Sequence, residues 1–398
     1  MRIFFRVLLV SLFVTLTALM GFCLLNLTLL KNFSNAFDTD IWSTEKLTPL
    51  TIINGRSADG GDIDQVDVPV SATPAAQFTD LEKAWAETGG QALIVWHDGE
   101  IKFEKYNGAA GPDQLFRSFS MHKSIVGLIA AMMAHEGLMD LDDPISMYVD
   151  EYRDGNRDDI TIRHALQHVT GLDRLPRSFR SLKFLEFQFG DDVEATALKV
   201  ARVNDTPVFD YSNINYQIAG AALRRILREK LGLSYAEYLQ QRLWVPIGAN
   251  AAKLWTESRR GAPRFYAGLQ ATPRDWLRIG MMLADNGIAN NAPVFAKEVL
   301  DVLTAPSQSN PNYGLGVWVG EPADGTREYG PSTALAVRHS APFADEDVFF
   351  FDGFGGQRVY ISRQTRTVIV RSGEIRFDWD DALLYNLAVS ALQNDVAP

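Results

Sequence analysis

The chain has 398 residues, of which 46% are hydrophobic and 11% aromatic, which is enough apolar material for a large folded core. Its formal net charge of −11 argues against binding to nucleic acid or to anionic lipid, because an acidic surface is repelled by both. Length alone allows two or three structural units, but one domain of about 320 residues made of two interleaved lobes fits equally well.

The first thirty residues are expected to be separate from that domain. Arg2 and Arg6 precede residues 7–30, about 24 residues without charge, which is long enough to cross a bilayer. Because positive charge stays in the cytoplasm, we expect an uncleaved transmembrane anchor that places the rest of the chain outside the cytoplasm. The alternative is a secreted protein whose export signal is removed, although no clear small-x-small cleavage site follows. Cys23 is the only cysteine, so disulfide pairing gives no information about the compartment.

The remaining chain divides into an arm and a domain. Residues 31–77 contain scattered Gly, Ser and Pro with little periodicity, which predicts a linker or an irregular arm packed on the domain. The domain is expected to cover residues 78–398. No internal repeat or low-complexity tract interrupts it.

Secondary-structure patterns predict that both ends of the domain contribute to one sheet. Residues 92–96 and 101–106 read as a β-hairpin. Helical patterns dominate a lobe inserted at about 120–300, strand patterns return at 314–372, and residues 379–392 predict a helix that covers the sheet. The expected fold is α+β with two lobes: an antiparallel sheet flanked by helices, and a helical lobe.

Ser120-Met121-His122-Lys123 opens a mostly apolar stretch that predicts a buried helix. A serine hydroxyl is a poor nucleophile near neutral pH and needs a base, and a lysine three residues later on a helix shares its face. Apolar surroundings can keep part of the lysine neutral, so that it accepts a proton. The same spacing occurs at Ser43-Thr44-Glu45-Lys46, but in a polar segment, which indicates chance. Alternatively, Ser120 is only a small residue at a buried helix start beside a solvated lysine.

A second pattern, Phe209-Asp210-Tyr211-Ser212-Asn213, precedes another helical stretch and is the only Tyr-x-Asn in the chain. Its Tyr211 and Asn213 are predicted on the loop that enters this helix. A phenol near a lysine can relay a proton to a leaving group, and an amide can donate to a substrate carbonyl and orient the lysine. Without Ser120, an ordinary Asn at a helix start beside a packing Tyr would be the better interpretation.

A third pattern is rich in glycine and lies between two apolar runs. Residues 348–361 read as a strand, a glycine-rich point of close approach at Gly353-Phe354-Gly355-Gly356, and a strand continuation. A simple hairpin turn is the alternative. A second buried strand is predicted at residues 367–370.

Other patterns do not indicate a metal or a cofactor. His164 and His168 have the i, i+4 spacing of zinc ligands, but Ala165 replaces the Glu of a metalloprotease motif. His122 is expected to pack beside Ser120. Neither the Gly-x-Ser-x-Gly pattern of α/β-hydrolases nor a nucleotide-binding glycine pattern occurs.

The three patterns, in this order, resemble the serine β-lactamase and penicillin-binding-protein superfamily, and most closely its class C-like branch with esterases and 6-aminohexanoate-oligomer hydrolases. Two further stretches agree with that branch: His168-Val169-Thr170-Gly171-Leu172 and Tyr313-Gly314-Leu315-Gly316-Val317-Trp318. The resemblance covers roughly residues 78 to 392.

The resemblance implies a role for each matching residue. Ser120 would be the acylated nucleophile, Lys123 its base, Tyr211 the proton relay and Asn213 the contact to the substrate amide. After Gly356, Gln357 would supply one backbone N–H of the oxyanion hole, and Ser120 the other.

Phe354 departs from the pattern. β-Lactamases and transpeptidases usually carry Lys or His at this position, so a cationic anchor for a substrate carboxylate is missing there, and efficient β-lactam hydrolysis is not expected.

The resulting hypothesis is a serine hydrolase that cleaves a small amide or ester through an acyl-enzyme at Ser120. The alternatives are a cell-wall D-amino-acid peptidase, a β-lactamase, or a penicillin-recognising receptor without turnover. The sequence identifies neither the acyl group nor the oligomeric state.

Overall fold

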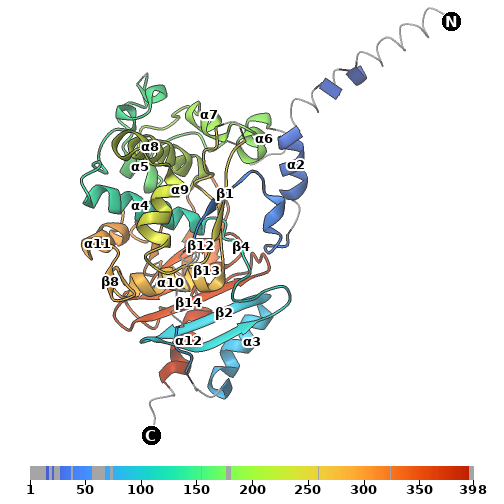
Figure 1. The fold of residues 1–398 in the computed structure, drawn as a ribbon, viewed down its shortest axis with the longest axis vertical. Helices are drawn as coiled ribbons and strands as arrows, with labels where there is room; N and C mark the ends of the chain where they lie inside the picture. Colours follow the sequence, from blue (N-terminus) through green and yellow to red (C-terminus); the bar gives the residue numbers. More distant parts are fainter. Residues whose placement is uncertain are drawn as a thin grey trace, which may run out of the picture.

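The computed structural model describes residues 15–17, 20–21, 27–36, 39–55, 68–71, 75–153, 155–175, 181–258, 260–322 and 324–393. At its centre is a six-stranded antiparallel sheet with the strand order β3-β2-β14-β13-β12-β9. The first two of these strands precede the helical lobe and the other four follow it, so the two ends of the domain meet in one sheet, as the sequence predicts (Figure 1).

Among the described residues, the strands fall into two main sheets and two short ribbons. The central sheet contains β2 (Gly90–His97), β3 (Glu100–Tyr106), β9 (Trp318–Val319), β12 (Phe349–Gly353), β13 (Gln357–Ser362) and β14 (Thr367–Gly373). The second sheet has the order β1-β5-β6-β4 and contains β1 (Leu50–Ile53), β4 (Phe116–Arg117), β5 (Ala252–Trp255) and β6 (Leu269–Ala271). The ribbons are β7 (Ile288–Ala289) with β8 (Ala292–Pro293), and β10 (Thr326–Glu328) with β11 (Ala336–Arg338).

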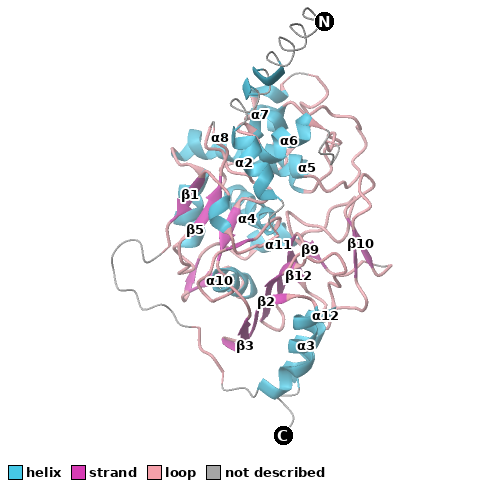
Figure 2. Ribbon diagram, turned by 90° about the vertical axis from the view of Figure 1, so that its right-hand side faces the viewer, coloured by secondary structure: helices cyan, strands magenta, loops and turns pink. Residues whose placement is uncertain are grey.

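Helices cover the central sheet and form the second lobe above it (Figures 1 and 2). They are α2 (Leu27–Ala36), α3 (Thr79–Glu87), α4 (Met121–His135), α5 (Ile162–Leu166), α6 (Leu182–Phe189), α7 (Val193–Leu198), α8 (Asn213–Leu231), α9 (Tyr235–Leu239), α10 (Pro273–Ala284), α11 (Glu298–Thr304) and α12 (Leu383–Gln393). The expected hairpin at 92–106 is confirmed as β2 and β3. The final helix is also present, but it begins at Leu383 rather than at residue 379.

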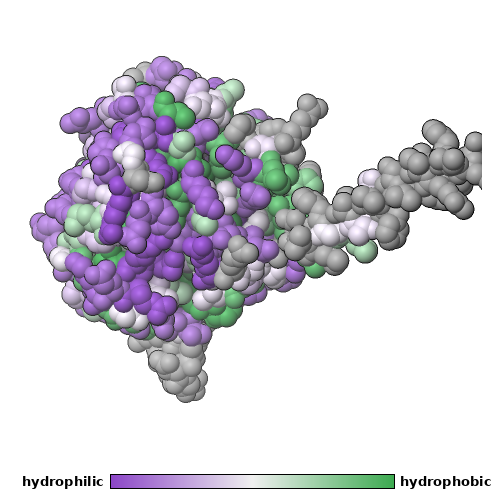
Figure 3. Space-filling model, turned by 90° about the horizontal axis from the view of Figure 1, so that it is seen from above, coloured by the Kyte–Doolittle hydropathy of each residue, from purple (hydrophilic) through white to green (hydrophobic). Residues whose placement is uncertain are grey.

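Successive residues of the central strands enter two different cores, because side chains alternate between the faces of a sheet. In β2, Ile94 and Trp96 join the core that contains α4 and α10, whereas Leu93 and Val95 join the core beneath α3 and α12. Figure 2 shows α3 and α12 lying next to each other at the end of the molecule opposite the helical lobe. The face seen from above is mostly hydrophilic, with apolar residues in small groups (Figure 3), which is consistent with the apolar content lying inside.

The predicted membrane-spanning helix is not supported. In the described part of the chain, no helix is long and apolar enough to cross a bilayer. Of the expected segment 7–30, only residues 15–17, 20–21 and 27–30 are described, and the rest lies outside the described residues. The last four belong to α2, which has ten residues and is therefore about 15 Å long, against an apolar bilayer thickness of about 30 Å. This helix contacts protein: Asn32 Nδ2 donates to the carbonyl of Phe189 at 3.0 Å, and Phe33 packs edge-on against the Phe189 ring.

Part of the expected arm is built into the second sheet. β1 pairs antiparallel with β5 from Leu50 opposite Trp255 to Ile53 opposite Ala252. Beside it, Arg117 Nη2 donates to the carbonyl of Ser43 at 2.8 Å, so the second Ser-x-x-Lys sequence lies in a packed segment.

Glycines allow the segment before β9 to lie directly against α4. A Cβ at Gly127, in the middle of α4, would stand 1.6 Å from the carbonyl oxygen of Leu315. Gly316 has φ of +88°, and a Cβ there would lie 2.4 Å from the carbonyl oxygen of Lys123, while Ser124 Oγ donates to the Gly316 carbonyl at 2.5 Å. The sequence Gly314-Leu315-Gly316 thus fixes the first half of α4 beside the sheet, and with it the position of Lys123.

Gly127→Ala should therefore destabilise the protein strongly, because a methyl group cannot share the space of a backbone carbonyl and α4 would have to move. We expect the free energy of unfolding to fall by about 2 to 4 kcal/mol, or no folded protein to form. Thermal unfolding followed by circular dichroism would measure it. Gly111→Ala is the matched control, because no atom lies within 4 Å of its added Cβ. Equal melting temperatures for the two variants would contradict this account of the contact.

Candidate active site

Ser120 lies immediately before α4, at the start of the helix. Its backbone carbonyl accepts from the N–H of Lys123 at 2.9 Å, so the helical turn between the two residues is formed. Phe119 has φ of +49°, a conformation that bulky residues rarely adopt. Such strain is commonly found at functional sites, where the surrounding structure holds it in place.

Lys123 is the centre of the site. Its side chain is 1% exposed, and Nζ lies 3.0 Å from Ser120 Oγ, 2.8 Å from Asn213 Oδ1 and 3.0 Å from the carbonyl oxygen of Tyr266. These three oxygens are uncharged and come from the start of α4, the start of α8 and the segment before β6. The interpretation of Lys123 as a solvated surface residue is therefore wrong.

Tyr211 completes this group. Lys123 Nζ lies 4.8 Å from the centre of the Tyr211 ring, which is almost fully buried. Ser212 caps α8 by accepting the Ile214 N–H, and this cap turns Tyr211 and Asn213 toward α4. The first two sequence patterns thus meet at one lysine.

His168 packs behind Tyr211 and is not arranged as a metal ligand beside His164. Its ring centre lies 4.4 Å from that of Tyr211, and its Nδ1 accepts the backbone N–H of Ser212 at 3.2 Å. Burial, together with the positive charges of Lys123 and Arg174, holds the pKa of His168 well below its usual value, so the ring is neutral. His164 instead belongs to the capping box of α5.

His122, inside the first pattern, is fully buried and contacts the Tyr235 hydroxyl. Burial lowers its pKa to about 3. It packs beside the site, as the sequence suggests, and its ring stays neutral near neutral pH.

The third pattern forms a tight hairpin beside the start of α4. β12 and β13 pair antiparallel from Phe349 opposite Ile361 to Gly353 opposite Gln357, so the glycine-rich point is the turn of a hairpin and the second apolar run is a separate strand. A Cβ on Gly353 would lie 2.7 Å from the Ser118 carbonyl, which places the end of β12 next to the residues before Ser120. Gly356, with φ of +90°, has no room for a side chain against Trp379.

Both polar atoms of the Gln357 side chain are engaged in hydrogen bonds within the sheet. Its Oε1 accepts the Gly373 N–H at 2.9 Å, and its Nε2 donates to the Gly373 carbonyl at 3.0 Å. The buried amide is thus paired with β14, and only the backbone of Gln357 remains for a role at the site.

Phe354 belongs to an exposed row of aromatic rings. Its ring centre lies 5.8 Å from that of Phe119 and 5.3 Å from that of Phe377. Phe354 is 39% exposed and Phe377 is 66% exposed. Arg358 does not replace the missing cation, because it is fully buried and paired with Asp352 and Asp381.

A cavity of about 510 Å³ opens next to the Tyr211 loop. Its lining includes His168, Asp210 and Asn215, together with Arg174, whose guanidinium is 3.0 Å from the Asp210 carboxylate. It therefore lies alongside the Lys123 group, with His168 contacting both the cavity and Tyr211.

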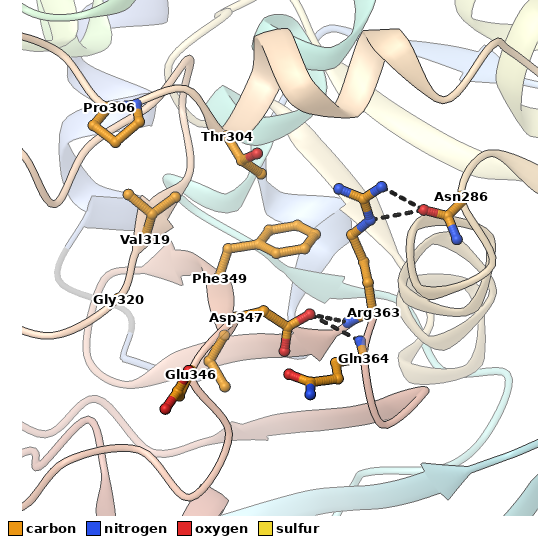
Figure 4. Close-up of a pocket in the computed structure, with 11 residues that line it drawn as sticks. Asn286, Thr304, Pro306, Val319, Gly320, Glu346, Asp347, Phe349, Arg363 and Gln364 are labelled. Atoms are coloured by element: carbon orange, nitrogen blue, oxygen red, sulfur yellow. Dashed lines mark hydrogen bonds between the residues drawn. The ribbon is translucent and has the colours of Figure 1, made fainter.

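A second hollow, of about 490 Å³, has a different character (Figure 4). Arg363 Nε donates to Asn286 Oδ1 at 2.8 Å, and Asp347 accepts the backbone N–H groups of Arg363 and Gln364, both at 2.8 Å. The side chains of Arg363 and Asp347 are thus both engaged in hydrogen bonds, and none of the described residues that line the hollow belongs to the Ser120 group. We do not assign the chemistry to this hollow.

Comparison with known proteins agrees with this geometry. Residues 78–388 match the family described as Beta-lactamase, which is more than half of the chain. The chain belongs to the Beta-lactamase family. This match supports the resemblance to the serine β-lactamase and penicillin-binding-protein superfamily that the sequence predicts.

One curated relative of this chain is a hydrolase. The 6-aminohexanoate-dimer hydrolase of Paenarthrobacter ureafaciens is 25% identical over 235 residues, which cover 56% of this chain and 59% of that protein. The match therefore spans less than two thirds of that relative.

Solved structures show the same fold at lower identity. A candidate 6-aminohexanoate-dimer hydrolase from Bacillus anthracis aligns with a TM-score of 0.70 at 18% identity, over 90% of this chain and 94% of that one. A D-stereospecific amidohydrolase from Streptomyces sp. aligns with a TM-score of 0.55 at 18% identity, over 81% of this chain and 99% of that one.

If Lys123 is the base, Lys123→Arg should slow acylation of Ser120 by about 100-fold or more, because a guanidinium with a pKa above about 12 does not accept a proton at neutral pH. The rate of labelling by a fluorophosphonate probe would measure this. Lys46→Arg, in the other Ser-x-x-Lys sequence, is the matched control, and thermal unfolding would verify that both variants fold. Labelling of Lys123→Arg at the wild-type rate would mean that Lys123 is structural.

Proposed function

We propose that this protein is a serine hydrolase that cleaves the amide or ester bond of a small molecule through an acyl-enzyme intermediate at Ser120. The observation that carries the proposal is the contact of 3.0 Å between Lys123 Nζ and Ser120 Oγ, within a buried group that also contains Asn213 and Tyr211. Nucleophilic catalysis requires a nucleophile and a base within hydrogen-bond reach of each other, and a third group that orients the base.

In the proposed reaction, Lys123 takes the proton of Ser120 as Oγ attacks the substrate carbonyl. The carbonyl π electrons move to its oxygen, and the backbone N–H groups of Ser120 and Gln357 stabilise the resulting oxyanion. When the carbonyl re-forms, the bond to the leaving group breaks, and Tyr211 passes the proton from Lys123 to the departing nitrogen or oxygen.

Water completes the cycle. It attacks the acyl carbonyl, gives its proton to the same Lys123 and Tyr211 pair, and releases a carboxylic acid as Ser120 regains its proton. Asn213 has two functions in this scheme: its Oδ1 holds Lys123 in place, and its amide group is near enough to the site to contact the substrate carbonyl region.

The surroundings of the site favour an uncharged, apolar substrate. Phe119, Phe354 and Phe377 present aromatic rings where a carboxylate-binding cation is missing, and the cavity beside Tyr211 has room for part of a small molecule. Named relatives include hydrolases of amides, the 6-aminohexanoate dimer among them. A panel of p-nitrophenyl esters, aminohexanoate amides, D-amino-acid amides and a chromogenic cephalosporin would identify the class. A burst of product without steady turnover would instead indicate a receptor that is acylated and not released.

A fluorophosphonate probe should label wild-type protein at Ser120, and Ser120→Ala should abolish both labelling and hydrolysis while the protein remains folded. Ser43→Ala is the matched control, because Ser43 heads the other Ser-x-x-Lys sequence, and it should label normally. Mass spectrometry of the labelled peptide would identify the modified residue. Equal labelling of Ser120→Ala would rule out the mechanism.

Phe354→Lys should shift specificity toward substrates that bear a carboxylate. A charge-assisted contact is worth about 1.5 to 3 kcal/mol, or roughly 10- to 150-fold in binding. The measurement is kcat/KM for one neutral ester and one cephalosporin, whose ratio should change by up to that factor. Phe354→Leu removes the ring without adding charge and is the control. A wild-type preference for the cephalosporin would make β-lactamase the better assignment.

A further inference from the structure

We infer that Tyr329 is a positioning residue that holds Tyr211 and the turn between β12 and β13 in fixed positions relative to each other. Tyr329 follows β10 and belongs to none of the three sequence patterns. Both segments that it joins flank Ser120, and the kinetic part of the inference rests on the proposed function.

On one side, Tyr329 holds the Tyr211 loop. Its backbone carbonyl accepts the Tyr211 N–H at 2.8 Å, and the two rings meet edge to face, with centres 5.1 Å apart and an interplanar angle of 90°. Gly330 has φ of +108°, and a Cβ there would lie 2.7 Å from Cα of Asp210. The backbone at 329–330 is therefore pressed against the residues that lead into Tyr211.

On the other side, Tyr329 holds the hairpin. Its hydroxyl donates to Asp352 Oδ2 at 2.5 Å, and Asp352 lies opposite Arg358 in the β12–β13 pair. Arg358 Nη1 lies 2.5 Å from Asp352 Oδ1 and also donates to the carbonyls of Gly353 and Gln357, at 3.0 and 2.9 Å. Those two residues are the ends of the turn, so the position of Asp352 is transmitted to both.

Two arginines and two aspartates form the buried charged group next to the turn, so their charges balance. Arg327 donates to Asp381 through Nε at 2.6 Å and Nη2 at 3.2 Å, and Arg358 Nη2 lies 3.0 Å from Asp381. Two arginines thus face Asp352 and Asp381, and all four side chains are at most 7% exposed. Buried charges cost several kcal/mol unless they are paired, and what such a group supplies in return is a fixed geometry.

Tyr329 remains a donor throughout the working pH range. Burial raises its pKa well above the usual value, so the hydroxyl keeps its proton. The route from Tyr211 to the turn is therefore one backbone hydrogen bond, one aromatic contact and one hydroxyl-to-carboxylate bond, all made by the same residue.

Removing the Tyr329 hydroxyl should let Tyr211 and the turn move independently. Misplacement of a catalytic group by about 1 Å can cost up to about 100-fold in rate. For Tyr329→Phe we expect kcat on a neutral alkyl ester to fall by about tenfold, with little change in KM, because the substrate-contacting surface is unaltered. Tyr148→Phe is the matched control, since it loses a hydroxyl-to-carboxylate bond of the same length, 2.5 Å to Asp143, in the helical lobe.

A double-variant cycle tests whether Tyr329 acts through Tyr211. In the Tyr211→Phe background, Tyr329→Phe should lower kcat less than it does in wild type, because one of the two groups that it positions is already gone. An equal fall in kcat in both backgrounds, or unchanged kcat in Tyr329→Phe alone, would overturn the inference.

Amide hydrogen exchange separates failure of the inference from failure of the proposed function. Peptides covering 209–213 and 353–357 should both exchange faster in Tyr329→Phe than in wild type, and in Tyr148→Phe they should not change. This measurement needs no substrate. It therefore tests the positioning role of Tyr329 even if Ser120→Ala proves fully active and the proposed function is wrong. Unchanged exchange in either peptide would show that Tyr329 does not link the two segments.

Discussion

The buried lysine between Ser120, Asn213 and the Tyr266 carbonyl is the constraint on which the site depends. An amine inside the protein must satisfy its hydrogen-bonding groups, and here three separate segments supply the oxygens. Each segment must therefore end at the right point: α4 begins after Ser120, α8 begins at Asn213, and the chain before β6 turns its carbonyl inward. A shift of one segment would leave a polar group of Lys123 without its partner, at a cost of about 1 to 3 kcal/mol.

This requirement explains why the glycines around the site lie where backbones touch. Gly127 and Gly316 let α4 and the segment before β9 approach to contact, which sets the depth of Lys123 below the surface. Gly353 performs the same function between the hairpin and the residues before Ser120. Close backbone packing brings the turn, Ser120 and Lys123 together, and the polar group around Asp352 keeps the turn from shifting.

The sequence predicts the parts of the site whose geometry depends on residues close together in the chain. Ser120 and Lys123 are one helical turn apart, and Tyr211 and Asn213 flank a helix cap, so their spacing carries the geometry. The alternation of apolar residues likewise predicts the central strands and the hairpin at 92–106.

The sequence does not predict the contacts that depend on tertiary structure. Tyr266 contributes through its backbone carbonyl, which its residue type does not reveal. Tyr329 and Asp352 are 23 residues apart, and nothing in either sequence neighbourhood predicts their contact. At the other end of the chain, hydrophobicity alone suggested a membrane span, whereas α2 buries Leu29 and Asn32 and contacts α6. An apolar stretch can be buried by protein as well as by lipid, and its composition does not distinguish the two.

In the proposed reaction, the charges near the turn would favour an oxyanion without attracting a carboxylate. Arg358 is neutralised by Asp352 and Asp381, whereas Arg371 makes no ion pair with any carboxylate in the described residues. Arg371 donates to the carbonyls of Gly356 at 3.0 Å and Thr88 at 2.6 Å. Burial, together with the charge of Arg358, lowers the pKa of Arg371 to about 9, so it stays cationic near neutral pH.

This positive charge lies beneath the turn and is inaccessible to solvent, so a substrate carboxylate cannot pair with it directly. It can still act on charge that develops at the turn itself, because electrostatic interactions are screened less in the interior than in water. A negative charge that exists only in the transition state would gain from Arg371, whereas a permanent charge at the mouth of the site would meet the rings of Phe354 and Phe377. In the proposed reaction, such an arrangement would stabilise the transition state more than the ground state, which is the condition for catalysis of a neutral ester or amide.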